Sequence, residues 1–425
     1  MSIEVNELGS PKTVVLHNCS IINVINGKIN NNSIIVIQDG KITYVGSETE
    51  SPQIKPSKEY DVKNLYVIPG LIDLHTHISF DGSPSAWSLS SLLKDPVGFR
   101  AIKATLEVRK YLESGFTTIR DLGSFNYEDL AIKRAINEGL IVGPNVFTSG
   151  KALSMTGGHG DLWVREELKS STFGLIVDGV ENVRFNTRKL IKLGVDWIKI
   201  LGTGGVASEG DYPDSPQFTY EELLAATYEA HSAKRYVAIH AHGPKGIELA
   251  IKAGADSIEH GSLLAEKPEL ATQMMEKSVA LVPTLAVTSF VVKRGSEEGL
   301  PDYAIKKTEA VIGTHKKSVK IAKESKVLIA VGTDSGYMVR HGESAWELKY
   351  LVEAGLNNLE SLQAGTINAA KVLRIDNYYG SVEQGKIADL VVVKVNPLEN
   401  IEGLINKENI VGVFKKGELL VNRGL

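Results

Sequence analysis

Two pairs of histidines in this chain have a spacing that suits a metal site. His75 and His77 lie in LIDLHTHI, and His240 and His242 lie in YVAIHAHG. Each pair ends an apolar run typical of a β-strand, in which residues two positions apart project from the same face. Each pair would therefore present two imidazoles to one space, and imidazole nitrogen is a common ligand of divalent metals. One such pair alone could arise by chance.

Three further polar residues lie within or just after apolar runs, namely Lys199 in DWIKIL, His260 in SIEHGS and Asp334 in GTDSG. Burial lowers the pKa of a lysine, and a neutral amine can condense with carbon dioxide to a carbamate whose oxygens bridge two cations. The alternatives are a lysine paired at the rim of the strands, a histidine bonded to a carbonyl and an aspartate that caps a helix. We favour a metal site because all these residues fall at strand ends.

The single cysteine, Cys19, excludes an internal disulfide and a cysteine-based zinc site, and it is expected to be a core residue. Nitrogen and oxygen ligands suit Zn²⁺, Mn²⁺, Co²⁺ or Fe²⁺. Two closely spaced cations would lower the pKa of a bridging water and polarise a carbonyl, and Asp334 could then carry a proton to a leaving amine. The predicted reaction is metal-assisted hydrolysis, with two divalent ions per chain and Zn²⁺ as the first choice.

Composition points to a small-molecule substrate. The 425 residues carry a formal net charge of −4 without a long run of one sign, so neither nucleic acid nor an anionic membrane is an expected partner. No stretch has the length of a membrane span, and the first residues lack the apolar core of a signal peptide. A cytoplasmic location is the expectation.

The middle of the chain alternates short apolar strands with amphipathic helical runs, which predicts an α/β fold with parallel strands. Eight such units favour a (β/α)₈ TIM-type barrel, whose catalytic groups lie at the carboxyl ends of the strands. An open doubly wound sheet is the structural alternative. The predicted strands are 71–78, 117–123, 145–150, 196–204, 236–243, 256–264, 280–287 and 327–336.

Both ends of the chain are predicted to be rich in β-structure. Asp39-Gly40 and Lys416-Gly417 are turn signals between apolar runs. We expect one small β-sandwich domain built from residues 1–68 and 373–425, with the barrel formed by 69–372. Two segments break the alternation, 151–180 and 288–302, and loops of this length are typically lids or binding loops.

The strand-end residues, in this order and spacing, resemble those of the amidohydrolase superfamily over nearly the whole chain. The stretches TSGKALSMTGGHGD, IKILGTGGV and GTDSG are similar to its prolidase-like branch, which comprises metal-dependent Xaa-Pro dipeptidases and imidazolonepropionase-related proteins. The resemblance implies homo-oligomers. It also implies a binuclear site with one metal on His75 and His77, the other on His240 and His260, Lys199 as a bridging N6-carboxylysine, and Asp334 as a ligand.

The same resemblance implies roles for residues near the substrate. Asp334 would be a proton shuttle and His242 would polarise the scissile carbonyl. His159, in GGHG, matches a position near the substrate carboxylate, and Arg340 and His341 are further candidates for substrate binding. The partner of that carboxylate stays open among the three arginines Arg120, Arg165 and Arg340. His231 and His315 are expected to be solvated residues on helices.

The predicted function is Xaa-Pro dipeptidase (prolidase) activity, in which a metal-bridging hydroxide attacks a C-terminal peptide or amide bond. Three alternatives stay open. The first is a hydrolase of other N-acyl amino acids, such as Xaa-Arg peptides or aromatic amides. The second is a mononuclear deaminase or an imidazolonepropionase-like ring hydrolase, and the third is a non-catalytic relative with the same fold.

Overall fold

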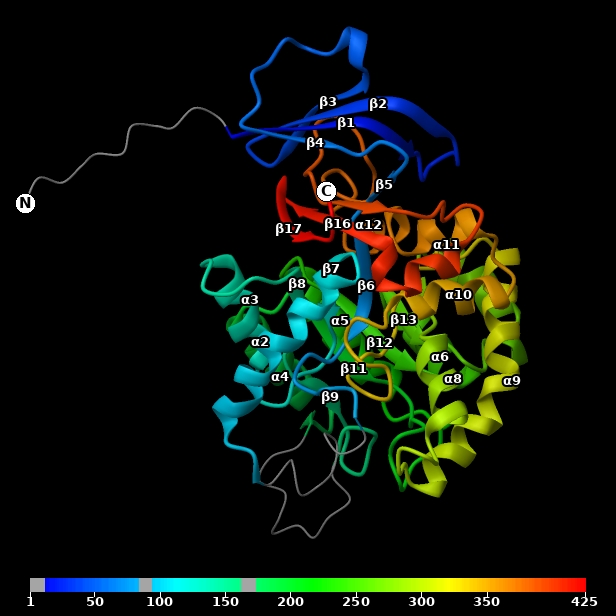
Figure 1. The fold of residues 1–425 in the computed structure, drawn as a ribbon. Coiled ribbons are helices and arrows are strands. Elements are labelled where there is room, and N and C mark those ends of the chain that lie inside the picture. Colours follow the sequence, from blue (N-terminus) through cyan, green and yellow to red (C-terminus); the bar gives the residue numbers. More distant parts are fainter. Residues whose placement is uncertain (1–11, 84–93, 162–172) are drawn as a thin grey trace, which may run out of the picture.

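Strands from both ends of the chain form one sheet. The computed structural model describes residues 12–83, 94–161 and 173–425 (Figure 1). Within these ranges the terminal sheet has eight strands, with the order β17-β16-β15-β5-β1-β2-β3 and β4 beside β1. They are β1 (Thr13–Ile22), β2 (Ile29–Gln38), β3 (Lys41–Ser47), β4 (Lys58–Asp61), β5 (Tyr66–Pro69), β15 (Leu390–Val393), β16 (Ile410–Lys415) and β17 (Glu418–Asn422).

The β5 strand joins the two ends, because it pairs parallel with β1 and antiparallel with β15. Both predicted hairpins are confirmed. Asp39 and Gly40 have φ angles of 48° and 79°, and Lys416 and Gly417 have φ angles of 49° and 73°. Two successive left-handed residues match the twist of the flanking strands in a tight hairpin. Cys19 is fully buried in the apolar core of this sheet, as predicted.

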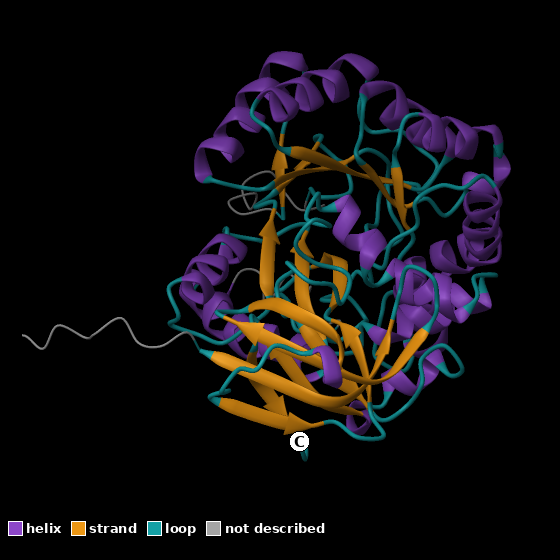
Figure 2. Ribbon diagram, turned by 90° about the horizontal axis from the view of Figure 1, so that it is seen from above, coloured by secondary structure: helices purple, strands orange, loops and turns teal. Residues whose placement is uncertain are grey.

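The remaining strands are parallel to their neighbours and lie inside the helices (Figure 2). One sheet, in the order β6-β7-β8, contains β6 (Leu71–Thr76), β7 (Phe116–Asp121) and β8 (Asn145–Thr148). The other has the order β10-β9-β11-β12-β13-β14. It contains β9 (Ala152–Ser154), β10 (Gly174–Ile176), β11 (Trp197–Leu201), β12 (Tyr236–Ala241), β13 (Ser257–His260) and β14 (Ala280–Val282).

Among the described residues, single helices alternate with strands from β6 to β8 and from β10 to α8, whereas β8, β9 and β10 are consecutive and five helices, α8 to α12, follow β14. Thr219 and Asn357 form capping boxes at the starts of α5 and α11, which satisfies backbone N–H groups there. The α-helices are α2 (Val97–Glu113), α3 (Glu128–Asn137), α4 (Val180–Leu193), α5 (Tyr220–Ser232), α6 (Pro244–Ala253), α7 (Glu269–Glu276), α8 (Leu285–Arg294), α9 (Asp302–Glu324), α10 (Ala345–Glu353), α11 (Asn358–Ala364) and α12 (Ile367–Val372). Short 3₁₀ turns are η1 (Glu48–Glu50), η4 (Leu264–Glu266), η5 (Ile401–Ile405) and η6 (Lys407–Asn409). No helix in the described ranges has the length and apolar character needed to cross a membrane.

Several predicted elements were wrong in extent or type. The predicted loop 151–180 contains the short strands β9 and β10. The predicted strand 280–287 ends at residue 282, and α8 begins at residue 285 and takes in the start of the predicted loop 288–302. The predicted strand 327–336 makes only isolated bridges, from Ile329 to Leu281 and from Ser335 to Thr76. Its extended course is interrupted because Asp334 has a left-handed φ of 58°.

The chain passes from the terminal sheet to β6 at Gly70, which packs closely against Thr117 of β7. The Gly70 N–H donates to the Asp389 carbonyl at 2.8 Å. A Cβ atom on Gly70 would lie 2.1 Å from Thr117 Oγ1. Only a residue without a side chain fits there.

We predict that Gly70→Ala lowers the free energy of unfolding by about 1–3 kcal/mol, the usual cost of overpacking a buried contact. Gly98→Ala is the matched control, because a Cβ atom there meets nothing within 4 Å. Urea unfolding of both variants measures the difference. Equal stability of the two variants would contradict the predicted clash.

Candidate metal centre

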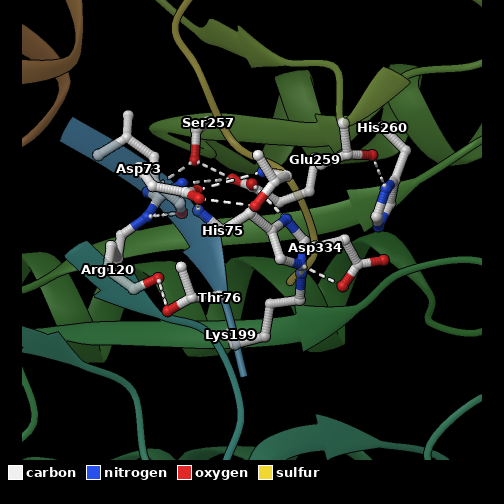
Figure 3. A network of polar contacts seen from close by, with 12 residues as sticks. Asp73, His75, Thr76, Arg120, Lys199, Ser257, Glu259, His260 and Asp334 are labelled. Carbon is white, nitrogen blue, oxygen red and sulfur yellow. Dashed lines mark hydrogen bonds and ion pairs between the residues drawn. The ribbon is translucent and has the colours of Figure 1, made fainter. Parts of the chain in front are cut away.

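The sequence-predicted ligands meet at the carboxyl ends of the parallel strands. His75 lies near the end of β6, Lys199 in β11, and His240 and His260 near the ends of β12 and β13. Figure 3 shows the side chains of His75, Lys199 and Asp334 directed toward one another. In each of two groups the potential ligand atoms lie within 4.8 Å of one another, and these groups are His75, His77 and Asp334, and His240, His242 and His260.

The first group is arranged around Asp334. Its Oδ1 lies 3.0 Å from Nε2 of His77 and 3.5 Å from Nε2 of His75. Lys199 Nζ lies 3.5 Å from the same nitrogen of His75. The two groups adjoin, since the rings of His75 and His260 are centred 5.0 Å apart.

Hydrogen bonds to the outer ring nitrogens decide which nitrogens are free for a metal. Nδ1 of His75 lies 2.9 Å from Glu259 Oε2, and Nδ1 of His77 lies 3.0 Å from the Gly123 carbonyl. These oxygens only accept, so each Nδ1 carries the proton and each Nε2 keeps its lone pair. His240 is reversed, because its Nε2 donates to the Gly204 carbonyl at 3.1 Å and leaves Nδ1 free.

The other two rings are bonded to hydroxyl groups. His242 Nδ1 lies 2.9 Å from Ser262 Oγ, and His260 Nδ1 lies 2.7 Å from Thr284 Oγ1. A hydroxyl group either donates or accepts, so these contacts permit both tautomers. His260 also has a left-handed φ of 70°, a conformation that costs a non-glycine residue about 1–2 kcal/mol.

Burial favours the neutral form of four imidazoles of the site, those of His75, His240, His242 and His260. It lowers the pKa of His75, together with nearby Lys199, to about 4, and it lowers the pKa of His242 to about 3. The pKa values of His240 and His260 are also well below their ordinary value, first because of burial and then because of neighbouring histidines. A neutral imidazole is the form that binds a metal ion.

The two charged groups of the site also fit a cation. Burial raises the pKa of Asp334, but the adjacent His75, His77 and Lys199 outweigh it and hold the pKa below its ordinary value. Burial lowers the pKa of Lys199 to about 8, which favours the neutral amine that a carbamate requires. Buried imidazoles, an ionised carboxylate and a lysine that loses its proton more readily than usual form a donor set that fits a pair of divalent ions.

The ligand groups lie at the base of a cavity of about 340 Å³. Apolar and aromatic side chains make much of its wall, and the polar residues include Ser208, Glu209 and Tyr303. Among the described lining residues, Lys199 is the only lysine or arginine. The apolar and aromatic residues of the wall are Phe80, Phe173, Leu201, Val206, Ala207, Val287, Val291 and Tyr337.

His159 and His242, two predicted substrate-binding residues, line this cavity. The ring of His159 stacks on His240 with centroids 4.6 Å apart, and its Nδ1 lies 2.7 Å from Ser208 Oγ. A Cβ atom on Gly205 would lie 2.1 Å from the His159 ring, so the ring depends on a glycine there. Lys307 Nζ donates to Asp211 Oδ1 at 3.2 Å and so anchors the loop that contains Gly205 and Ser208.

The structure places the two other predicted substrate residues outside the described cavity wall. His341 is buried, with Nδ1 2.7 Å from Tyr111 Oη and Nε2 2.5 Å from the Phe80 carbonyl. Arg340 is half-exposed and lies 3.4 Å from Glu298 Oε1. These contacts account for the orientation of both side chains.

The positions of Arg120, Arg165 and His315 can also be compared with the predictions from the sequence. Arg120 is buried beneath the site, and Arg165 lies outside the described residues. The prediction for His315 was wrong, because the ring is buried and its Nε2 donates to the His260 carbonyl at 3.1 Å. The spacing of the buried residues of α9 was the signal that could have placed it, namely Ala304, Thr308, Val311, His315, Ser318, Val319 and Ala322.

Comparison with known proteins decides the family. The model of the amidohydrolase family matches residues 66–420. The chain belongs to this family. As an amidohydrolase it is a hydrolase of C–N bonds, and the resemblance predicted from the strand-end residues is confirmed.

Named relatives of this amidohydrolase cover nearly its whole length. Ochratoxinase of Aspergillus niger is 35% identical over 416 residues, which cover 93% of this chain and 84% of that protein. The crystal structure of a prolidase complexed with N-methylphosphonate-L-proline is 31% identical, with a TM-score of 0.87 and coverage of 96% and 100%. That of a Xaa-Pro dipeptidase with bound methionine is 33% identical, with a TM-score of 0.86 and coverage of 96% and 99%.

We predict that Lys199→Met removes bound metal and lowers amide hydrolysis by at least about 100-fold, because the two groups then lose the ligand between them. Lys199→Glu is the matched variant, since it returns a carboxylate to the same strand position and should keep more metal than Lys199→Met. Elemental analysis of the purified variants measures the metal. Equal metal content in Lys199→Met and the unaltered protein would exclude Lys199 as a ligand.

Proposed function

We propose that this amidohydrolase is a binuclear metal-dependent enzyme that cleaves a C-terminal amide bond, with Xaa-Pro dipeptides as the preferred substrates. The observation that carries the proposal is the meeting of two groups of buried histidines, with Lys199 and Asp334, in the lining of a largely apolar cavity. The prolidase and Xaa-Pro dipeptidase structures among its neighbours support the choice of substrate.

In this proposal the ligand set divides into two halves. His75, His77 and Asp334 would hold one ion, and His240 and His260 would hold the other. Lys199, as N6-carboxylysine, would supply carboxylate oxygens to the same site. Zn²⁺ is the first choice, and Mn²⁺, Co²⁺ or Fe²⁺ would suit the same ligands. When bound, such ions polarise a carbonyl and lower the pKa of water.

The protein's own groups would move the protons. Asp334 accepts a proton from the attacking water and delivers it to the nitrogen of the cleaved amide bond, so that the leaving group departs as a neutral amine. His242 faces the cavity with its Nδ1 beside Ser262. If Nδ1 accepts from Ser262, Nε2 carries the proton and donates a hydrogen bond to the scissile carbonyl oxygen.

The hydroxyl group of Tyr303 would bind the free carboxylate of the substrate, in a described cavity where Lys199 is the only lysine or arginine. His159 would donate to it only in the doubly protonated form, because its Nδ1 donates to Ser208, whose own hydroxyl proton goes to Asp211. Burial raises the pKa of Tyr303, so its hydroxyl group stays protonated and can donate. The apolar wall suits a small apolar residue and excludes water from the amide.

A hydrolase of aromatic N-acyl amino acids is the second candidate. The ochratoxinase relative and the phenylalanines in the cavity wall favour it. A mononuclear deaminase, an imidazolonepropionase-like ring hydrolase and a non-catalytic relative are less favoured. The reason is that Lys199 lies 3.5 Å from His75, and every predicted metal ligand is present.

We also infer that the two parallel sheets close into one (β/α)₈ barrel through residues 327–336. The support is the pair of bridges that join this segment to β14 and β6. The terminal sheet would then form the small β-sandwich domain, with the barrel limited to 69–372. A cytoplasmic homo-oligomer is the proposed state of the protein.

A dipeptide library tests the substrate. We predict that the metal-replete protein releases free proline faster than any other C-terminal residue, and that a chelator abolishes the reaction because the carbonyl is no longer polarised. Mass spectrometry of the products measures both effects. N-acylated aromatic amino acids are included as competing substrates.

Each outcome of this screen has a separate meaning. Faster cleavage of the N-acylated aromatic amino acids would replace the prolidase proposal by the second candidate. Hydrolysis that continues unchanged in chelator would overturn the metal-dependent mechanism itself.

A further inference from the structure

A buried ion pair lies directly behind His75 (Figure 3). Arg120 of β7 and Glu259 of β13 are both fully buried, and Arg120 Nη2 donates to Glu259 Oε1 at 2.8 Å. The guanidinium also donates from Nε to the Leu74 carbonyl at 2.7 Å and lies 4.3 Å from the centre of the Trp197 ring. These contacts hold a permanent positive charge in the interior, next to the ligand group.

Both oxygens of Glu259 are used as acceptors. Oε1 accepts from Arg120 and, at 2.5 Å, from the Ser257 hydroxyl group, whereas Oε2 accepts from Nδ1 of His75 at 2.9 Å. The guanidinium of Arg120 and the hydroxyl group of Ser257 both donate to Oε1, which stabilises the ionised carboxylate. A carboxylate that only accepts allows one tautomer of His75, the one with its lone pair on Nε2.

The second half of the site is supported differently. The outer nitrogens of His242 and His260 meet the hydroxyl groups of Ser262 and Thr284, and that of His240 meets a backbone carbonyl. None of these three partners carries a charge. A carboxylate behind a ligating histidine raises the basicity of the ring, which a neutral partner does less.

We propose that Arg120 and Glu259 are positioning residues that make the His75, His77 and Asp334 half the tighter of two unequal metal sites. Arg120 fixes the ionised Glu259, and Glu259 fixes His75 with Nε2 toward the ion. The proposal rests on the binuclear function proposed above. The half with this buried ion pair therefore fills first when metal is limiting.

Stepwise zinc binding tests this proposal. Metal-free full-length protein is titrated with Zn²⁺ against a chromophoric chelator, which gives one constant for each step. We expect Glu259→Gln to weaken the tighter step by about 10–100-fold, because the amide must turn its NH₂ group toward a donor or toward His75. The matched control is Thr284→Val, which removes the hydroxyl partner of His260 and should weaken the other step.

A double variant separates positioning from stability. Glu259→Gln alone leaves the charge of Arg120 buried without its partner, which can prevent folding. Arg120→Met with Glu259→Gln removes both charges. We expect this double variant to fold, as judged by the thermal midpoint of the metal-free protein. Its tighter zinc-binding step should still be weaker than that of the unaltered protein.

The results that would overturn the proposal are specific. Zinc constants of the double variant equal to those of the unaltered protein would exclude a positioning role, as would a loss confined to the weaker step. Unaltered protein that binds no zinc would instead overturn the binuclear function on which the proposal rests.

Discussion

An imidazole offers a metal ion a lone pair on only one nitrogen at a time, and the bond to the other nitrogen decides which one. The arrangement of this site depends on that constraint. Glu259 and the Gly123 carbonyl fix Nε2 of His75 and His77 as the free nitrogens, and the Gly204 carbonyl fixes Nδ1 of His240. Burial adds the second condition, since it lowers the pKa of His75 and of His240 and so favours the unprotonated ring.

The strands position most of these rings, but irregular backbone orients two of the expected ligands, His260 and Asp334. His260 and Asp334 both have left-handed backbone angles, which are costly for residues other than glycine. The hydrogen bonds of the neighbouring segments maintain this conformation at Asp334, whose N–H donates to the His75 carbonyl at 2.8 Å. His260 and Asp334 both line the cavity, and backbone strain at such positions is typical of functional sites.

Much of the ligand set could be predicted from local patterns, because HxH at a strand end has a fixed geometry. The segment 327–336 could not, because the turn at Asp334 depends on contacts with β6 rather than on its apolar sequence. The role of Glu259 could not be predicted from the sequence, because a buried carboxylate needs an identified partner and Arg120 lies 139 positions away in the chain. His341 follows the last predicted strand closely in sequence, yet it packs against Tyr111.

Anomalous diffraction from crystals of the zinc-loaded protein would test the central claim most directly. We expect two zinc peaks at the base of the cavity. One would contact Nε2 of His75 and His77 with Asp334, and the other would contact Nδ1 of His240 with His260, with the extended density of a carboxylated Lys199 between them. A single peak, or an unmodified Lys199 amine with no metal beside it, would contradict the binuclear site.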